Sequence, residues 1–454
     1  MRVVRSLALI LALWIFILFS DGLTVAQPPG DNLDYSRIVN YIDASKIQQH
    51  VSVLAGVDTR LTGTKGFYRA VVYLVSALNR SVDRLLLHKY KVIVPIDEGS
   101  YLTVKEDGGR VIKLYPLWPN LVEACPVPEG GIENSRLIYV GRGSLEDLSR
   151  HDVNGSIVLM EFNSLDNWVK AFELGARAVV FIEPFETTRW EALSKQVMLP
   201  VNMPRFMISR SDAIYLKKLL EKGSVKVSLV SRNRLEEREG INIVAVIQGE
   251  GKSDEAVFLG AHFDSWSIVP SKAPGAEDAT AAAFLVELAR YFGEHRPYRT
   301  VVILLLSGHW EALAGAREFT ENFFFNNVTY GLKPYFALFF DFTSGSDKLG
   351  LFYGGFFYGR SAWRSGSYGE AGVQSYFEGW LTRNLKVVEK QTGLSPKNLV
   401  TDPIYTTSYL DLVPYRAFFD VEPITLACFS LSYQIHTIHD VAPCLLYTSD
   451  AADE

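Results

Sequence analysis

Several histidines and carboxylates in the middle of the chain each stand at the end of an apolar run or just before one. They are His262, Asp264, Asp278, His309 and Glu311. Imidazole and carboxylate groups together form the ligand set that zinc and similar divalent metals prefer. Their spacing therefore indicates a metal centre built by several segments of the chain.

The elements that must position these side chains follow from hydrophobic patterning. Residues 242–247 and 256–259 are two β-branched, apolar runs separated by a polar turn, which predicts adjacent buried strands. His262 and Asp264 then lie where a strand leaves the sheet, the usual place for chemistry in open α/β folds. Apolar residues recur at helical spacing over 284–292, so Asp278 stands at a helix N-terminus. Residues 301–306 predict another buried strand, which ends just before His309.

These motifs, in this order, resemble peptidase family M28, which comprises co-catalytic zinc aminopeptidases and carboxypeptidases. The resemblance extends from about residue 47 to residue 440. It rests on His-x-Asp at 262–264, Gly-Ala-x-Asp at 275–278, Ala-Leu-Ala-Gly-Ala-Arg-Glu-Phe at 312–319, Phe-Phe-Asp at 339–341 and His-Thr-x-x-Asp at 436–440. It implies an α/β fold, with a mixed, mostly parallel sheet flanked by helices and a small inserted β-rich domain.

The resemblance also implies a ligand set. Asp278 would bridge two metal ions, His262 would bind one of them, and Asp341 and His436 would bind the other. Asp264 would hydrogen-bond the free nitrogen of His262 and fix its tautomer. Taken singly, each of these residues is better explained as a satisfied polar group at a strand end. As an ordered set they favour metal binding.

The chain departs from the family pattern at one place. The family has two consecutive Glu after the strand at 301–306, a general base and a metal ligand, whereas this chain has His309 and Trp310. Trp cannot bind a metal, but His309 could act as the base or as the missing ligand. Glu311 lies one residue out of register. We therefore expect one tightly bound zinc, and a second only at raised metal concentration.

The leading functional hypothesis is an exported metal-dependent exopeptidase that removes residues from the ends of peptides or proteins. One alternative is a binding or structural protein that kept the M28-like fold but lost turnover. Another is an acyltransferase like the related glutaminyl cyclases. The net charge of −6 and the lack of long basic runs argue against a nucleic-acid partner.

Composition also divides the chain into units. Residues 1–26 have a basic start, an apolar core and small residues before a Pro-rich segment, as in a signal peptide, so we expect an extracellular or cell-surface protein. The alternative is an uncleaved membrane anchor. Residues 116–235 resemble the protease-associated (PA) domain often inserted in M28 chains, which leaves 31–115 and 236–443 as the catalytic unit.

Two further segments have no predicted role in the chemistry of the site. Residues 444–454 resemble the read-through translation of a sequencing adapter, so we expect the natural C-terminus, and any membrane attachment in it, to be missing. Residues 59–64 lie between two helical patterns, and we interpret them as a packing turn.

Overall fold

The computed structural model describes residues 35–120, 122–326, 329–342, 349–353, 386–393, 399–402, 423–428, 438 and 440. The predicted signal peptide, the adapter-like segment and His436 lie outside these residues. Within the described part, no helix is long and apolar enough to cross a bilayer.

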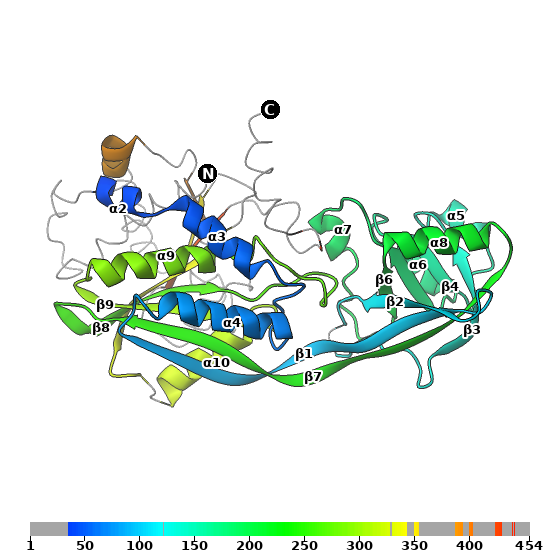
Figure 1. The fold of residues 1–454 in the computed structure, drawn as a ribbon, viewed down its shortest axis with the longest axis horizontal. Coiled ribbons are helices and arrows are strands. Elements are labelled where there is room, and N and C mark those ends of the chain that lie inside the picture. Colours follow the sequence, from blue (N-terminus) through cyan, green and yellow to red (C-terminus); the bar gives the residue numbers. More distant parts are fainter. Residues whose placement is uncertain are drawn as a thin grey trace, which may run out of the picture.

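The chain forms two lobes joined by a long two-stranded ribbon (Figure 1). The helices are α2 (Tyr35–Tyr41), α3 (Ala44–Leu54), α4 (Lys65–Leu78), α5 (Leu145–Ser149), α6 (Asn167–Glu173), α7 (Arg189–Leu193), α8 (Arg210–Leu220), α9 (Thr280–Glu294), α10 (Ala314–Thr320) and the π-helical turn η1 (Glu321–Phe325). The strands are β1 (Arg84–Val104), β2 (Arg110–Pro116), β3 (Ile132–Tyr139), β4 (Ile157–Glu161), β5 (Ala178–Ile182), β6 (Arg205–Ile208), β7 (Val225–Ile247), β8 (Lys252–His262), β9 (Arg299–Leu306), β10 (Lys333–Asp341), β11 (Leu349–Tyr353), β12 (Leu399–Asp402) and β13 (Pro423–Cys428).

The first lobe contains a mixed sheet in the order β1-β7-β9-β8-β10-β13-β11-β12. Its centre is parallel, because β9, β8, β10 and β13 pair in the same direction. β7 and β11 run antiparallel to their central neighbours. This arrangement confirms the predicted α/β class with a mostly parallel sheet.

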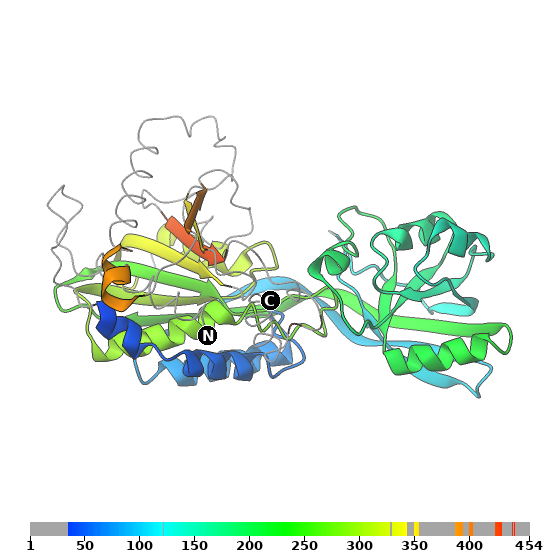
Figure 2. The same cartoon turned by 90° about the horizontal axis from the view of Figure 1, so that it is seen from above.

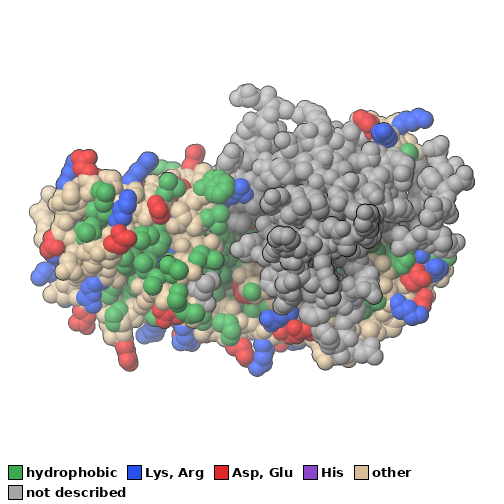
Figure 3. All heavy atoms as spheres, turned by 180° about the vertical axis from the view of Figure 1, so that it is seen from behind, with side chains coloured by type: hydrophobic (Ala, Val, Ile, Leu, Met, Phe, Trp, Pro, Cys, Tyr) green, Lys and Arg blue, Asp and Glu red, His purple; other side chains and the backbone are tan. Residues whose placement is uncertain are grey.

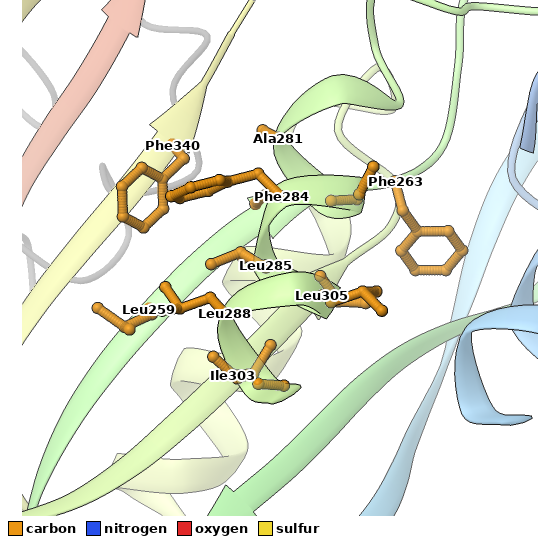
Figure 4. Packing of buried hydrophobic residues seen from close by; sticks show 14 of the residues in the cluster. Leu259, Phe263, Ala281, Phe284, Leu285, Leu288, Ile303, Leu305 and Phe340 are labelled. Atoms are coloured by element: carbon orange, nitrogen blue, oxygen red, sulfur yellow. The ribbon is translucent and has the colours of Figure 1, made fainter. Parts of the chain in front are cut away.

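Helices cover both faces of this sheet, which explains the unbroken apolar strands. Every residue of β9 is buried, as expected for a strand packed on two faces. On one face α3, α4 and α9 pack against alternate strand residues such as Leu259 and Ile303, and Figure 4 shows Phe284, Leu285 and Leu288 of α9 in this layer. On the other face α10 packs on the intervening residues, such as Phe258 and Leu304.

The second lobe is built from strands that close on themselves. Their order is β1-β2-β6-β5-β4-β3-β7, and β7 pairs again with β1. Alternate residues of β4 face two different cores. Ile157 and Leu159 pack with β1, β2 and β7, whereas Val158 and Met160 pack toward α6 and toward Trp266 of the first lobe. The second core therefore joins the two lobes.

Strands β1 and β7 run through both lobes as one antiparallel ribbon (Figure 2). The sequence predicts separate strands at 85–94 and 101–104, but β1 is continuous, with a register irregularity between Asp97 and Ser100. Gly99 lies in this irregularity at φ +142°, a backbone region that favours glycine. The expected division at 116 and 235 remains a proposal, and both positions lie inside strands.

Candidate metal centre

His262 ends β8 and is 4% exposed. Its Nδ1 lies 3.5 Å from Asp264 Oδ1, in the fully buried segment that follows the strand. The other oxygen, Asp264 Oδ2, accepts hydrogen bonds from Thr62 Oγ1 at 2.9 Å and from the backbone N–H of His309 at 3.1 Å. Asp264 thus holds the two histidine-bearing segments together and lies beside His262, while the hydrogen bond expected between their side chains stays a prediction.

Asp278 stands two residues before α9, at the helix N-terminus as predicted. Its Oδ2 accepts a hydrogen bond from the Trp266 backbone N–H at 3.3 Å. Burial raises the pKa of Asp278 to about 6, although the nearby charges of His262 and Arg60 oppose the rise. A carboxylate buried this deeply is costly unless a cation stands next to it.

Arg60 provides positive charge beneath these carboxylates. It is fully buried, and its guanidinium donates hydrogen bonds to the carbonyls of Phe263 at 3.0 Å, Leu54 at 3.0 Å and Gly275 at 2.6 Å. Burial lowers the pKa of Arg60, while the charges of Asp278, Asp440 and Asp264 support its protonated form. Arg60 therefore fixes the loop before α9 and offsets part of the buried negative charge.

A further buried carboxylate comes from the end of the described chain. Asp440 is 1% exposed, and its Oδ1 accepts from the Glu277 backbone N–H at 3.0 Å. Its own carbonyl accepts from Ala276 N at 3.0 Å. Burial, followed by the charges of Glu277 and Asp278, raises the pKa of Asp440 well above its usual range.

The loop between β9 and α10 carries His309, and one side chain holds both of its ends. Asn242 Oδ1 accepts from Ser307 N at 3.0 Å, and Asn242 Nδ2 donates to Gly315 O at 2.8 Å. Inside the loop, Ala312 and Leu313 lie at φ +55° and +59°. These left-handed conformations are strained for residues with a Cβ atom.

The imidazole of His309 stacks on that of His262, with centroids 4.0 Å apart and planes 20° from parallel. Zinc binds imidazole nitrogen at about 2.0–2.1 Å in the ring plane. Nearly parallel rings aim their nitrogens along parallel lines, so His309 must rotate before both rings can bind one ion.

Trp310, which stands where the family pattern has a ligand carboxylate, is packed among aromatic rings. It stacks on Trp266 with centroids 5.5 Å apart and planes 29° from parallel. It meets His262 edge-on at 6.2 Å and His309 edge-on at 4.8 Å. Trp310 therefore belongs to the core that joins the two lobes.

Glu311 turns its carboxylate inward. Both of its oxygens are buried, and neither has a hydrogen-bond partner among the described residues. Burial, and then the charge of Asp264, raises the pKa of Glu311 well above its usual range. An orphaned buried carboxylate of this kind needs either a proton or a cation.

The structure brings most of the predicted site residues together around His262: Asp264, Asp278, His309 and Glu311. Asp341 ends β10 as expected, on the strand that pairs with β8. The part of the chain that the structure describes contains no group of three His, Cys, Asp or Glu side chains arranged to hold a metal. The predicted set includes His436, which lies outside that part, so the assignment of ligands stays a prediction.

Sequence reasoning missed two residues that contact the site. Arg60 and Thr62 lie in the segment interpreted as a packing turn, yet Thr62 bonds Asp264 and also accepts from Gly308 N at 2.9 Å. The available signal was the Arg-x-x-Gly-Thr pattern at 60–64, which the M28 family shares.

The residues present fit a divalent cation by the chemistry of their donors. Imidazole and carboxylate groups converge at the ends of β8 and β9, and the carboxylates of Asp264, Asp278, Glu311 and Asp440 outnumber the one buried guanidinium beside them.

The stretch that carries the His262, Asp278 and Asp341 motifs agrees with a known family. Residues 242–395 match the profile of peptidase family M28. The chain contains an M28 peptidase domain. The resemblance inferred from the motifs between 262 and 341 is thereby confirmed, and the fold agrees with that of solved relatives.

Three similar proteins define the extent of this likeness. A vacuolar membrane protease of Schizosaccharomyces japonicus is 35% identical over 91 residues, which cover 20% of this chain and 10% of that protein. The M28 peptidase precursor of Shewanella amazonensis superposes with a TM-score of 0.53 at 18% identity, over 98% of this chain and 95% of that one. The zinc aminopeptidase BSAP of Bacillus subtilis superposes with a TM-score of 0.52 at 16% identity, over 90% of this chain and 92% of that one. The match to the vacuolar protease thus spans about a tenth of the length of that relative.

Proposed function

We propose that the protein is an exported, zinc-dependent exopeptidase that hydrolyses terminal peptide bonds. The observation that carries this proposal is the excess of buried carboxylates around His262, which only a bound cation or several protons can offset. The M28 domain supports zinc as the cation, and peptides or proteins as substrates.

In this proposal His262, Asp278, Asp341 and His436 would hold zinc, one ion tightly and a second weakly. The metal, when bound, would polarise the scissile carbonyl and lower the pKa of a water molecule. Asp264 accepts the His309 backbone N–H and lies beside His262 Nδ1, so it orients both histidines. His309 takes the place of the family's general base, because an imidazole nitrogen can accept a proton.

Glu311 is the second candidate for the proton-transfer role. Its orphaned carboxylate lies near Asp264, and its raised pKa favours a protonated acid that could donate to the leaving amine. Its side chain lies directly before Ala312 and Leu313, whose φ angles are positive.

We further propose that the second lobe is a PA-like unit that faces substrate, and that residues 1–26 direct export to the cell surface or beyond. The vacuolar membrane location in the name of one relative supports a membrane-associated compartment. Attachment would come from an uncleaved N-terminus or from a natural C-terminal extension.

One observation favours a second function, a binding protein without turnover. Trp310 occupies the position of a ligand carboxylate and is packed into the core that joins the lobes. Such a chain would bind a peptide terminus without cleaving it.

A reporter screen on the zinc-loaded protein separates these functions. Aminoacyl reporters should be hydrolysed, and chelation or Asp278→Asn should abolish the hydrolysis together with zinc retention in elemental analysis. Cyclisation of an N-terminal glutaminyl reporter would instead identify an acyltransferase. A folded, zinc-bearing protein inert toward every reporter would support the binding protein and refute the exopeptidase.

A further inference from the structure

An exposed apolar surface lies on the second lobe beside the residues that lead to the candidate site. Val122, Met198, Leu199 and Val201 are 62%, 58%, 64% and 39% exposed. Scattered exposed apolar residues are normal, whereas adjacent ones mark interaction sites. Figure 3 shows hydrophobic side chains gathered over the second lobe on one face of the molecule.

These four residues form one surface because Asn120 links their two segments. Its Nδ2 donates to Val201 O at 2.8 Å, and its Oδ1 accepts from Val122 N at 2.8 Å. We call Val122, Met198, Leu199 and Val201 the apolar loop surface.

Buried neighbours hold this loop in place. Val197 precedes it and is 6% exposed, and Met203 follows it, and both pack in the core that also contains Trp266. The loop connects α7 to β6, and α7 lies on the side of the second lobe that faces the first (Figure 1). The exposed side chains are therefore presented by a fixed backbone.

A row of aromatic rings joins this surface to the candidate site. Trp118, two residues before Asn120, meets Trp266 edge-on with centroids 5.5 Å apart. Trp266 stacks on Trp310, and Trp310 meets His262. Trp118 and Trp310 are each partly exposed. Ring contacts thus link Trp118, in the segment that leads to Asn120, with His262.

We infer that the apolar loop surface binds apolar side chains of a peptide whose terminus lies at His262. This inference rests on the proposed peptidase function and specifies its substrate class, which is a peptide of several residues with large apolar side chains away from the terminus. An extended chain advances about 3.3 Å per residue, so a peptide of several residues extends well past the position of its terminal residue.

The composition of the loop argues against a lipid surface as its ligand. Residues 196–204 contain no Lys or Arg. Surfaces that bind anionic bilayers combine apolar side chains with basic ones. An uncharged apolar loop instead fits the side chains of a peptide.

The test measures equilibrium binding of two labelled peptides of equal length, one rich in Leu and Phe and one of Gly and Ser, by fluorescence anisotropy. The full-length double variant Met198→Ser/Leu199→Ser should bind the apolar peptide at least about tenfold more weakly, because two buried contacts are lost. Val72→Ser, at a 70% exposed position on α4 of the first lobe, should leave binding unchanged.

Controls separate this inference from the proposed function. Hydrolysis of a single-residue aminoacyl reporter should be the same in both variants, since such a reporter does not reach the loop. Peptide binding without hydrolysis in any variant would refute the exopeptidase and keep the inference. Unchanged peptide affinity in Met198→Ser/Leu199→Ser would overturn the inference. If Met198→Ser/Leu199→Ser instead abolished co-sedimentation with vesicles, the surface would bind a membrane and the inference would be wrong. If the variant instead abolished a dimer seen in size-exclusion chromatography, the surface would bind a second copy and the inference would again be wrong.

Discussion

Restoring the family pattern with His309→Glu and Trp310→Glu should lower the stability of the metal-free protein and raise its affinity for zinc. The double variant loses the Trp310 stack on Trp266, its edge contact with His262, and the His262–His309 stack. Aromatic pairs contribute about 0.5–1.5 kcal/mol each, so the metal-free variant should be about 1.5–4.5 kcal/mol less stable than the unmodified chain. In exchange, two carboxylates stand where the M28 pattern has its base and its ligand.

Zinc should reverse this loss. A ligand that binds only the folded state at 100 times its Kd stabilises that state by about 2.7 kcal/mol. We therefore expect a larger zinc-induced rise in Tm for the double variant than for the unmodified chain. Calorimetric titration of the metal-free protein should show occupancy rising from one ion toward two.

The matched control is His309→Gln with Trp310→Gln, which removes the same rings and adds side chains of nearly the same shape without charge. It should lose stability to a similar degree and gain no zinc. Equal zinc stoichiometry and equal Tm shifts in all three proteins, with the variants folded, would refute the reasoning. Two equivalent tight sites in the unmodified chain, insensitive to His309→Ala, would refute it as well.

Three further predictions concern buried charge and backbone strain. Arg60→Met should destabilise the chain by about 3–5 kcal/mol in urea unfolding, because the buried carboxylates lose their cation; an unchanged midpoint would contradict this. Lys195 is fully buried, and burial lowers its pKa from the usual 10.5 to about 8. Between pH 8 and pH 10.5 the unfolded chain therefore binds more protons than the folded chain. Stability should therefore rise across that window by about 3 kcal/mol, and Lys195→Met should remove the rise. Ala312→Gly should stabilise the chain by about 1 kcal/mol by relieving its positive φ, whereas Ala316→Gly inside α10 should destabilise it, and thermal melts would compare the two.

The sequence predicts the strands and the histidine of the site because local patterning determines them. Runs such as 301–306 are buried on both faces, and only a central strand combines that burial with so short a length. His262 at a strand end and Asp278 before α9 follow directly from where these runs stop.

The ribbon could not be predicted in the same way. Residues 232–239 are rich in charge, a composition that does not indicate a strand, yet they form the middle of β7. Their stability comes from cross-strand partners such as Lys89 with Glu239 at 3.0 Å and Lys91 with Glu237 at 2.7 Å. Such pairing depends on a distant strand and leaves no period in either segment.

Long-range contacts also explain what was missed at the site. The role of Arg60 depends on carbonyls at 263 and 275, some two hundred residues away. The left-handed residues Ala312 and Leu313 lie in a loop whose two ends are bonded by Asn242, some seventy residues away in the sequence. Neither is encoded in neighbouring residues.

Because β1 pairs with β7 residue by residue in both lobes, the length of the ribbon can change only by whole residue pairs. Each residue pair advances the strands by about 3.4 Å, so the length of the ribbon determines how far the second lobe stands from His262. Adding one residue to each strand would turn every following side chain to the opposite face and separate the second core from Trp266. Adding two would restore the faces and displace the lobe by about 7 Å. Ribbon length should therefore vary among related proteins in steps of two residue pairs. Each step would change the distance between the candidate metal centre and the apolar loop surface.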